Sequence, residues 1–343
     1  ELHTELRDVF APYKHIQVDA SGPLRNLRFV DAVSEGLNEV MKKWDKAVLM
    51  GQDIADYGGV FKITEGFIDR YGLDRVRNTP LCESAVIGIA LGMSMKSYKP
   101  MVEMQFADFV SCGFNQIVNN LAKIHYRWGH NADVVIRMPT GGSVGAGPFH
   151  SQSNEAWFAH TPGLKIVYPS NPGDAKGLLI ASFEDPNPVL FFEHKALYRS
   201  LEGDVAEGYY NTEIGKAKCL REGNELSIIT YGLGVHWAVD AVKRKNIDAD
   251  ILDLRTIVPL DYEAIESSVR KTGKAIVLHE DTLFGGIGAE ISAYITEHLF
   301  ESLDGPVIRV ASLDTPIPFN SALEKQFLAN NRLDEALDKL KAY

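Results

Sequence analysis

Short, continuous apolar runs alternate with helical patterns along most of this 343-residue chain, and this alternation constrains its fold more than any other feature. The runs at residues 47–50, 134–138 and 189–192 are typical of strands buried on both faces. Residues 29–44 instead carry apolar side chains every three or four positions, as an amphipathic helix does. We therefore expect an α/β protein whose parallel sheets are covered by helices on both faces.

A break in this pattern at residues 201–213 divides the chain into two parts. At roughly 150 residues per domain, the length also fits two domains. We expect two doubly wound domains, at residues 26–200 and 214–343, joined by a linker at 201–213. Residues 1–25 mix charged and aromatic side chains without a sustained period, which indicates a linker or an extended arm.

Composition excludes several classes of protein. The chain has 46 Asp and Glu against 35 Lys and Arg, a net charge of −11, which disfavours broad nucleic-acid binding. Cys82, Cys112 and Cys219 lack zinc-site spacing and fit a reduced compartment. The longest apolar run, around residues 85–95, is too short to cross a membrane. We expect no membrane association, and a cytoplasmic location, or the mitochondrial matrix if the source is eukaryotic.

Glu83 stands where a predicted strand gives way to an apolar helix. A carboxyl group enclosed by apolar side chains can keep its proton near neutral pH and share it with a ligand nitrogen. A surface glutamate stabilised by the helix N-terminus would suit the same position. The residues alone leave both interpretations open.

Two further segments follow predicted strands, at the end of a parallel sheet where ligands bind. Phe106 and Phe109 could stack on a flat ring or belong to the core. Residues 141–150 are rich in glycine and end at His150, which could act as an acid, a base or an anion contact. This glycine spacing matches neither a dinucleotide fingerprint nor a P-loop, so a tight turn followed by a helix cap is the alternative.

Taken together, the motifs resemble one family over residues 26–343, the β subunits of the decarboxylating component of 2-oxo acid dehydrogenase complexes. The resemblance rests on the order and spacing of residues 80–83, 103–109, 141–153, 158–163 and 253–259. The branched-chain (2-oxoisovalerate) members look most similar, and the pyruvate members come next. The family implies a transketolase pyrimidine-binding domain followed by a transketolase C-terminal domain.

The resemblance also implies a cofactor, thiamine diphosphate, bound between an α and a β subunit. Glu83 is similar to the glutamate that hydrogen-bonds the N1′ atom of the aminopyrimidine ring. Phe109 matches the aromatic position beside that ring, where some branched-chain members carry Tyr, and Gln105 lies in the same cofactor-binding stretch. His150 matches a histidine that faces the substrate and the lipoyl arm, and it would position groups and transfer protons during acyl transfer.

A structural potassium site in some relatives is matched by five residues. Its ligands would be the side chains of Asp185 and Asn187 and the backbone carbonyls of Ala132, Val134 and Val135. The side chains around these carbonyls differ from the family's usual ones.

The Gly-Asp-Gly sequence that begins the Mg²⁺–diphosphate motif of thiamine enzymes is missing from this chain. The resemblance therefore implies that an α subunit, or a fused α region, holds Mg²⁺ and the diphosphate in an α₂β₂-type assembly. We expect this chain to be inactive alone. Because it begins with Glu1, it could be the C-terminal half of an α–β fusion. The other expected partners are a small 2-oxo acid and a lipoyl acyltransferase core.

Three alternatives stay open beside the branched-chain interpretation. A pyruvate or acetoin dehydrogenase β subunit would share the cofactor chemistry, and one methylene in an acyl pocket is worth only about 1–3 kcal/mol. A non-catalytic subunit that docks on the acyltransferase core would leave Glu83 without a role in turnover. A nicotinamide dehydrogenase would share the α/β alternation, but the dinucleotide fingerprint is missing.

Overall fold

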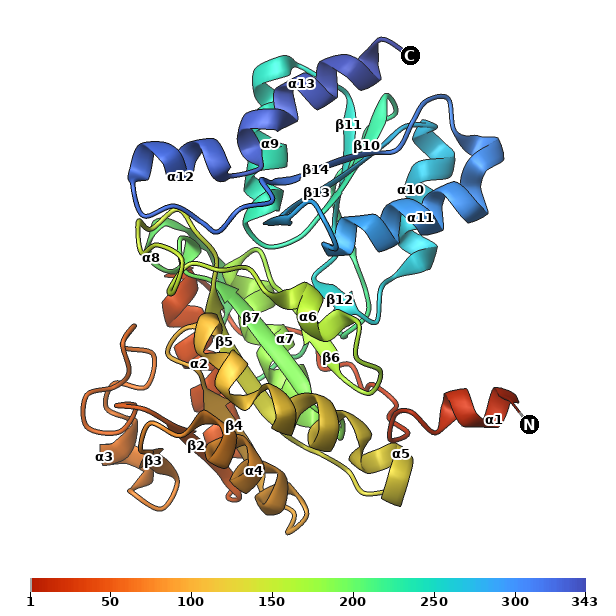
Figure 1. Ribbon diagram of the computed structural model, residues 1–343. Coiled ribbons are helices and arrows are strands. Elements are labelled where there is room, and N and C mark those ends of the chain that lie inside the picture. The colour runs from red at the N-terminus through yellow and green to blue at the C-terminus, as the bar shows by residue number, and fades with distance from the viewer. Residues whose placement is uncertain (1) are drawn as a thin grey trace.

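The computed structural model describes residues 2–343 and has two α/β units, stacked one above the other in Figure 1. The first unit is built on a seven-stranded sheet of order β12-β6-β7-β5-β4-β2-β3. Its strands are β2 (Ala47–Gly51), β3 (Val76–Asn78), β4 (Lys99–Glu103), β5 (Val135–Thr140), β6 (Lys165–Val167), β7 (Val189–His194) and β12 (Thr256–Val258). All neighbours pair in parallel except β12 with β6, which confirms the predicted α/β class.

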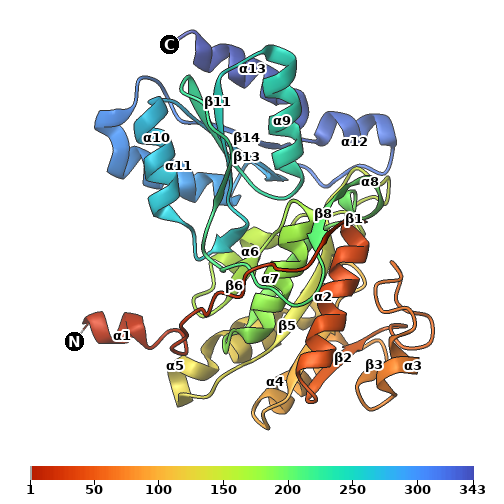
Figure 2. The same cartoon turned by 180° about the vertical axis from the view of Figure 1, so that it is seen from behind.

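Helices cover both faces of this sheet because alternate strand residues point in opposite directions. Ala47 and Leu49 pack with α2 (Phe29–Lys43) and α7 (Pro172–Glu184), which lie side by side in Figure 2. Val48 and Met50 pack on the other face with α4 (Glu83–Ser94). Asn171 followed by Pro172 predicts a helix start from the sequence. The start of α7 confirms it, since the Asn171 side chain accepts a hydrogen bond from the Asp174 N–H at 2.9 Å.

The second unit has a five-stranded sheet of order β14-β13-β10-β11-β9, in which only β9 is antiparallel to its neighbour. The strands are β9 (Lys218–Arg221), β10 (Leu226–Thr230), β11 (Ala249–Asp253), β13 (Ala275–Thr282) and β14 (Ile308–Ser312). The helices are α9 (Leu233–Lys245) and α13 (Asn330–Lys341) on one face, and α10 (Tyr262–Thr272) and α11 (Ile287–Leu299) on the other. The shorter α12 (Ser321–Phe327) reaches toward the first unit (Figure 1).

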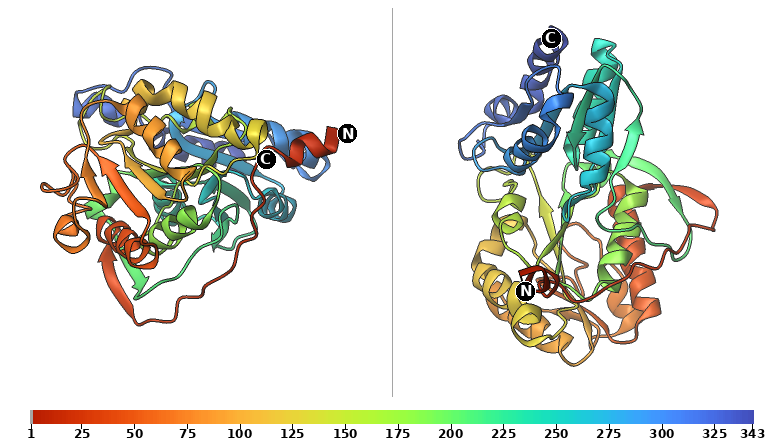
Figure 3. Two further views of the ribbon diagram at one scale, coloured as in Figure 1. Left: turned by 90° about the horizontal axis from the view of Figure 1, so that it is seen from below. Right: turned by 90° about the vertical axis from the view of Figure 1, so that its right-hand side faces the viewer.

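The predicted linker at 201–213 contains a strand, β8 (Glu202–Ala206). It pairs antiparallel with β1 (Leu24–Arg28), so the predicted boundary at residue 26 falls inside a paired strand. The short α1 (Leu2–Arg7) and a long extended segment precede β1, and Figure 3 shows this arm running around the first unit. The arm is anchored, because the Ala11 N–H donates to the Asn187 Oδ1 at 2.7 Å.

The sequence pattern of residues 109–124 predicts one helix, but the structure of this stretch is irregular. The structure has a 3₁₀ segment η1 (Ala107–Gly113), a π-helical turn η2 (Gln116–Asn120), a 3₁₀ turn η3 (Leu121–Lys123) and a short α5 (Ile124–Trp128). Gly113 packs so closely against α4 that a Cβ there would lie 2.3 Å from the Ile87 side chain. A side chain at this position would force Ile87 to shift. Interruptions such as the π-helical turn are frequent at functional sites.

The two units share a core and a sheet. The strand β12 belongs to the second unit in sequence, yet Thr256 pairs with Val167 at the edge of the first sheet. One apolar cluster runs from Val48 in β2 to Leu252 in β11. The remaining short elements are α3 (Phe67–Tyr71), α6 (Glu155–Ala159), α8 (Leu197–Ser200) and η4 (Phe300–Ser302).

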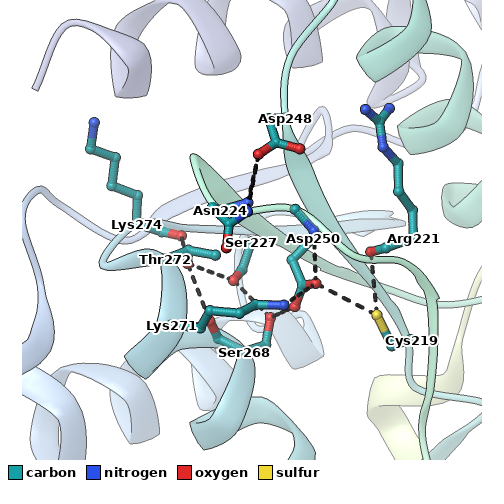
Figure 4. A network of polar contacts seen from close by, with 11 residues as sticks. Cys219, Arg221, Asn224, Ser227, Asp248, Asp250, Ser268, Lys271, Thr272 and Lys274 are labelled. Carbon is teal, nitrogen blue, oxygen red and sulfur yellow. Dashed lines mark hydrogen bonds and ion pairs between the residues drawn. The ribbon is translucent and has the colours of Figure 1, made fainter.

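A buried polar network stabilises the second unit, as Figure 4 shows. The Asp250 carboxylate accepts hydrogen bonds from the Lys271 ammonium at 2.6 Å and from the Ser268 hydroxyl. Ser268 is also bonded to Ser227 at 2.7 Å. Burial would raise the pKa of Asp250, but Lys271 and Ser268 together lower it. This network ties α10 to β10 and β11, and it lies within the second unit.

Across the described residues, we find no helix with both the length and the apolar character needed to cross a membrane.

Candidate active site

Loops at the carboxyl ends of β2, β4, β5 and β7 surround a group of polar residues that includes the predicted Gln105 and His150. Because these strands are parallel neighbours, their carboxyl ends meet at one edge of the sheet. Gln52 and Asp53 follow β2, Gln105 follows β4, and the glycine-rich loop, residues 141–152, follows β5. The α4 helix begins next to them.

Glu83 is the first residue of α4, and its side chain is half-buried. The Gln52 side-chain amide donates to its Oε1 atom at 3.3 Å. Within the described residues no hydrogen bond to Oε2 is found, so this oxygen is available to a ligand. The sequence left two interpretations of Glu83 open, a carboxyl enclosed by apolar side chains and a surface glutamate at a helix N-terminus. In this chain it is partly open to solvent, with Leu81 82% exposed two residues before it.

Phe106 is the centre of an aromatic cluster that the sequence did not reveal as a unit. Its ring lies 5.7 Å from that of Phe109, 4.7 Å from that of His150 and 5.7 Å from that of Phe61, all edge to face. Phe109 and His150 are 5.5 Å apart. The structure therefore brings together the two residues predicted here, while Gln105 points to Asp53, with its Nε2 atom 3.4 Å from Oδ2.

The glycine-rich loop closes on itself at its base. The Gly141 N–H donates to the Gln152 carbonyl at 3.3 Å, and the Gln152 side chain donates to the Asp108 carboxylate at 2.9 Å. Gly141 has a φ of 86°, and a Cβ there would lie 2.1 Å from the His194 ring. Only glycine fits this position. Asp108 thus joins the His150 loop to the segment that carries Phe109.

Two buried cations lie behind the cluster. Arg137 is fully buried between Glu103 and Glu193, with its Nη1 atom 2.6 Å from Glu103 Oε2. Burial raises the pKa of Glu103, and Arg137 partly offsets that rise. The Lys195 ammonium donates to the Gly141 carbonyl at 2.8 Å and lies 5.7 Å from the Phe106 ring, and burial lowers its pKa to about 8.

This arrangement suits a flat nitrogen heterocycle. It offers a carboxylate oxygen for a ring nitrogen, aromatic side chains beside it, and an imidazole at the rim. Within residues 2–343, no group of three or more His, Cys, Asp or Glu side chains is placed to hold a metal ion.

Comparisons with known proteins agree with the resemblance. The family described as "Transketolase, pyrimidine binding domain" matches residues 25–200, and "Transketolase, C-terminal domain" matches residues 215–332. The 2-oxoisovalerate dehydrogenase subunit beta of Bacillus subtilis is 44% identical over 92% of this chain and 98% of its own length. The chain belongs to the family of 2-oxo acid dehydrogenase β subunits.

Other members of the family are nearly as similar. The mitochondrial 2-oxoisovalerate dehydrogenase subunit beta of Dictyostelium discoideum is 42% identical over 89% of this chain and 84% of its own. The pyruvate dehydrogenase E1 component subunit beta of Bacillus subtilis is 41% identical over 90% of this chain and 96% of its own length. A solved split-gene transketolase, described as an inactive beta4 tetramer, shares the fold with a TM-score of 0.75 at 21% identity, covering 92% of this chain and 98% of its own.

The five residues matched to a potassium site are engaged with protein groups in this β subunit. The Lys165 ammonium pairs with the buried Asp185 carboxylate, and the Asn187 side chain donates to Asp185 Oδ1 at 2.8 Å. The Ala132 carbonyl accepts the Val134 N–H at 2.7 Å, and the Val134 carbonyl accepts the Val189 N–H at 3.0 Å. Val135 lies within β5. Lys165 is thus the counter-ion of Asp185 in this structure, and the potassium site stays a prediction.

Proposed function

We propose that this β subunit acts in the thiamine-diphosphate-dependent oxidative decarboxylation of a branched-chain 2-oxo acid, in an active site that an α subunit or a fused α region completes. The observation that carries the proposal is the position of Glu83 at the start of α4, with Gln52 bonded to Oε1 at 3.3 Å and Oε2 left for a ligand. Thiamine diphosphate, when bound, supplies the electron sink for decarboxylation.

The roles of the residues follow from their surroundings. Glu83 would hold a proton between its Oε2 atom and the N1′ nitrogen of the aminopyrimidine, while Gln52 fixes the orientation of the carboxylate. Phe109 would lie beside the aminopyrimidine ring, and Gln105 would support that side of the site. His150, packed edge to face on Phe106 and Phe109, would orient the substrate and move a proton while the acyl group passes to lipoamide.

A partner chain would cover the rim of this site. Large apolar side chains stand exposed around it, with Leu81 at 82%, Phe149 at 72% and Phe319 at 70%. Exposed apolar groups of this kind mark protein interaction surfaces. We assign Mg²⁺ and the diphosphate to the α partner of an α₂β₂-type assembly, and we assign the lipoyl acyltransferase core as the acceptor of the acyl group.

Pyruvate is the second candidate substrate, because the Bacillus subtilis pyruvate and 2-oxoisovalerate subunits are 41% and 44% identical to this chain. We place the protein in the cytoplasm of a bacterium, or in the mitochondrial matrix of a eukaryote.

The test is an assay of CO₂ release from 2-oxoisovalerate and from pyruvate, run side by side with thiamine diphosphate, Mg²⁺ and a coexpressed α-type subunit. We expect kcat/KM to be higher with 2-oxoisovalerate. A higher value with pyruvate would assign the chain to a pyruvate complex. If neither substrate is turned over although the assembly forms, the decarboxylase proposal fails and the docking role is favoured.

A further inference from the structure

We propose that the C-terminal unit holds the glycine-rich loop in place through two carboxylates, Glu280 and Glu324, and that these are positioning residues for His150. We call these two carboxylates and their contacts with the loop the clamp, and all of its contacts lie within this chain. Its consequence for turnover rests on the role proposed above for His150.

Glu280 extends from β13 across the boundary between the two units and is 6% exposed. Its Oε1 atom accepts the Gly142 N–H at 2.6 Å, at the start of the loop, and the Ser153 hydroxyl at 3.3 Å, directly after the loop's last residue. Its Oε2 atom is 2.7 Å from the His194 Nε2 atom. A single side chain of the C-terminal unit therefore holds both ends of the segment that carries His150.

Only a carboxylate satisfies all of these groups. The Nδ1 atom of His194 accepts the Ala196 N–H at 3.2 Å, so we assign the ring proton to Nε2, which donates to Glu280. Glu280 is thus surrounded by donors on both oxygens. A glutamine would turn its own N–H₂ group toward a donor, either His194 or Gly142, in a site with little access to water.

Glu324, in α12, provides the second contact and is 4% exposed. Its two carboxylate oxygens lie 3.3 and 3.2 Å from the Gly145 nitrogen. The neighbouring loop positions pack on the same unit, since a Cβ at Gly142 would lie 2.6 Å from the Ile317 side chain and one at Gly147 would lie 2.1 Å from Phe319.

The loop needs such support because its own sequence does not order it. Four of its residues, Gly141, Ser143, Gly145 and Gly147, have positive φ angles between 65° and 86°. Glycine loses more conformational entropy than any other residue when it is fixed, and Ser143 is held in an unfavourable region. A cavity of about 560 Å³ between the loop tip and α12 gives the loop room to move once the carboxylate contacts are lost.

Hydrogen exchange of the assembled α/β protein tests the clamp. We expect the loop amides to exchange about tenfold faster or more in Glu280→Gln and in Glu324→Met, and to stay at the wild-type rate in Asp250→Asn. Asp250 is a matched control, because it is 2% exposed and belongs to the network of Figure 4, within the same unit. Glu324→Met keeps the length of the side chain but has no oxygen to accept the Gly145 N–H, so it reports on the clamp even if Glu280→Gln does not fold.

Turnover provides the second readout. We expect kcat for acyl transfer to lipoamide to fall at least tenfold in both glutamate variants, while KM for the 2-oxo acid changes less than about twofold. Wild-type exchange rates at the loop in a folded Glu324→Met protein would overturn the clamp, and wild-type kcat values with faster exchange would overturn the positioning role. An inactive wild-type assembly would instead refute the proposed function, and the exchange result would still decide the clamp.

Discussion

The Arg137 guanidinium and the Glu193 carboxylate form a bidentate ion pair that is buried away from solvent. Nε lies 2.6 Å from Oε1 and Nη2 lies 2.7 Å from Oε2, and neither side chain is exposed. The third guanidinium nitrogen, Nη1, donates to the Glu103 Oε2 atom at 2.6 Å. Because Glu103 ends β4 and Glu193 lies in β7, Arg137 in β5 links three of the four strands whose carboxyl ends carry the site.

We predict that Arg137→Met destabilises the chain by about 3–5 kcal/mol, because it leaves two buried carboxylates without a counter-ion. Equilibrium unfolding in urea measures the change. Arg244→Met is the control, since the Arg244–Asp334 pair is 56% and 40% exposed, and exposed pairs contribute about 1 kcal/mol or less. Equal losses in the two variants would contradict the account.

The buried carboxyl group of Glu155 makes the free energy of unfolding depend on pH. It is fully buried, and it accepts a hydrogen bond from the Tyr231 hydroxyl on Oε1 at 2.7 Å. Burial, reinforced by Asp281, raises the pKa of Glu155 from 4.5 to about 8. Between these values the folded chain binds a proton that the unfolded chain has released, so the contribution of Glu155 is lost as the pH rises through this range.

We therefore predict that Glu155→Gln, which mimics the protonated form, weakens the pH dependence of unfolding. At pH 8.5 the free energy of unfolding of the variant should exceed that of the wild type by at least ~1.4 kcal/mol, the equivalent of one pKa unit. At pH 5 the two proteins should be similar. Denaturant unfolding at both pH values gives the comparison, and parallel pH profiles would refute the raised pKa.

Lys165 should stabilise the chain through Asp185. The carboxylate is 1% exposed, and the Lys165 ammonium is its counter-ion. We predict that Lys165→Met costs about 3–5 kcal/mol of unfolding free energy, because the buried charge is left unpaired. Lys216→Met is the control, since its pair with Glu263 spans 3.8 Å and is 52% and 91% exposed. Thermal unfolding of the two variants side by side distinguishes them, and a loss no greater than the control's would exclude the counter-ion role.

Local signals in the sequence were sufficient where neighbouring residues determine the structure. The helix start at Asn171 and Pro172 is an example, because the cap and the fixed φ act within one turn. The strand β12 was not predicted, since three residues at Thr256–Val258 carry little pattern of their own. Their strand conformation depends on pairing with β6, about 90 residues earlier in the chain.

The site was only partly predictable for the same reason. Phe109 and His150 were selected because each follows a strand end, and the structure places them side by side at 5.5 Å. Glu280 was missed, although it directly follows the apolar run at residues 275–279, whose pattern predicts a strand. Its partners, Gly142 and His194, belong to the other unit, and no local pattern reveals contacts across a domain boundary. The cofactor roles of Glu83, Gln105, Phe109 and His150 stay predictions.

Turnover of a Glu83→Gln variant tests the central claim most directly. CO₂ release from 2-oxoisovalerate would be measured for the wild-type chain alone, for the wild-type α/β assembly and for the variant assembly, with Glu65→Gln as an exposed control. The account predicts no activity for the chain alone, full activity in the wild-type and control assemblies, and a loss of about 10²-fold or more in the variant with assembly intact. Activity of the chain alone, or a Glu83→Gln assembly as active as the wild type, would contradict it.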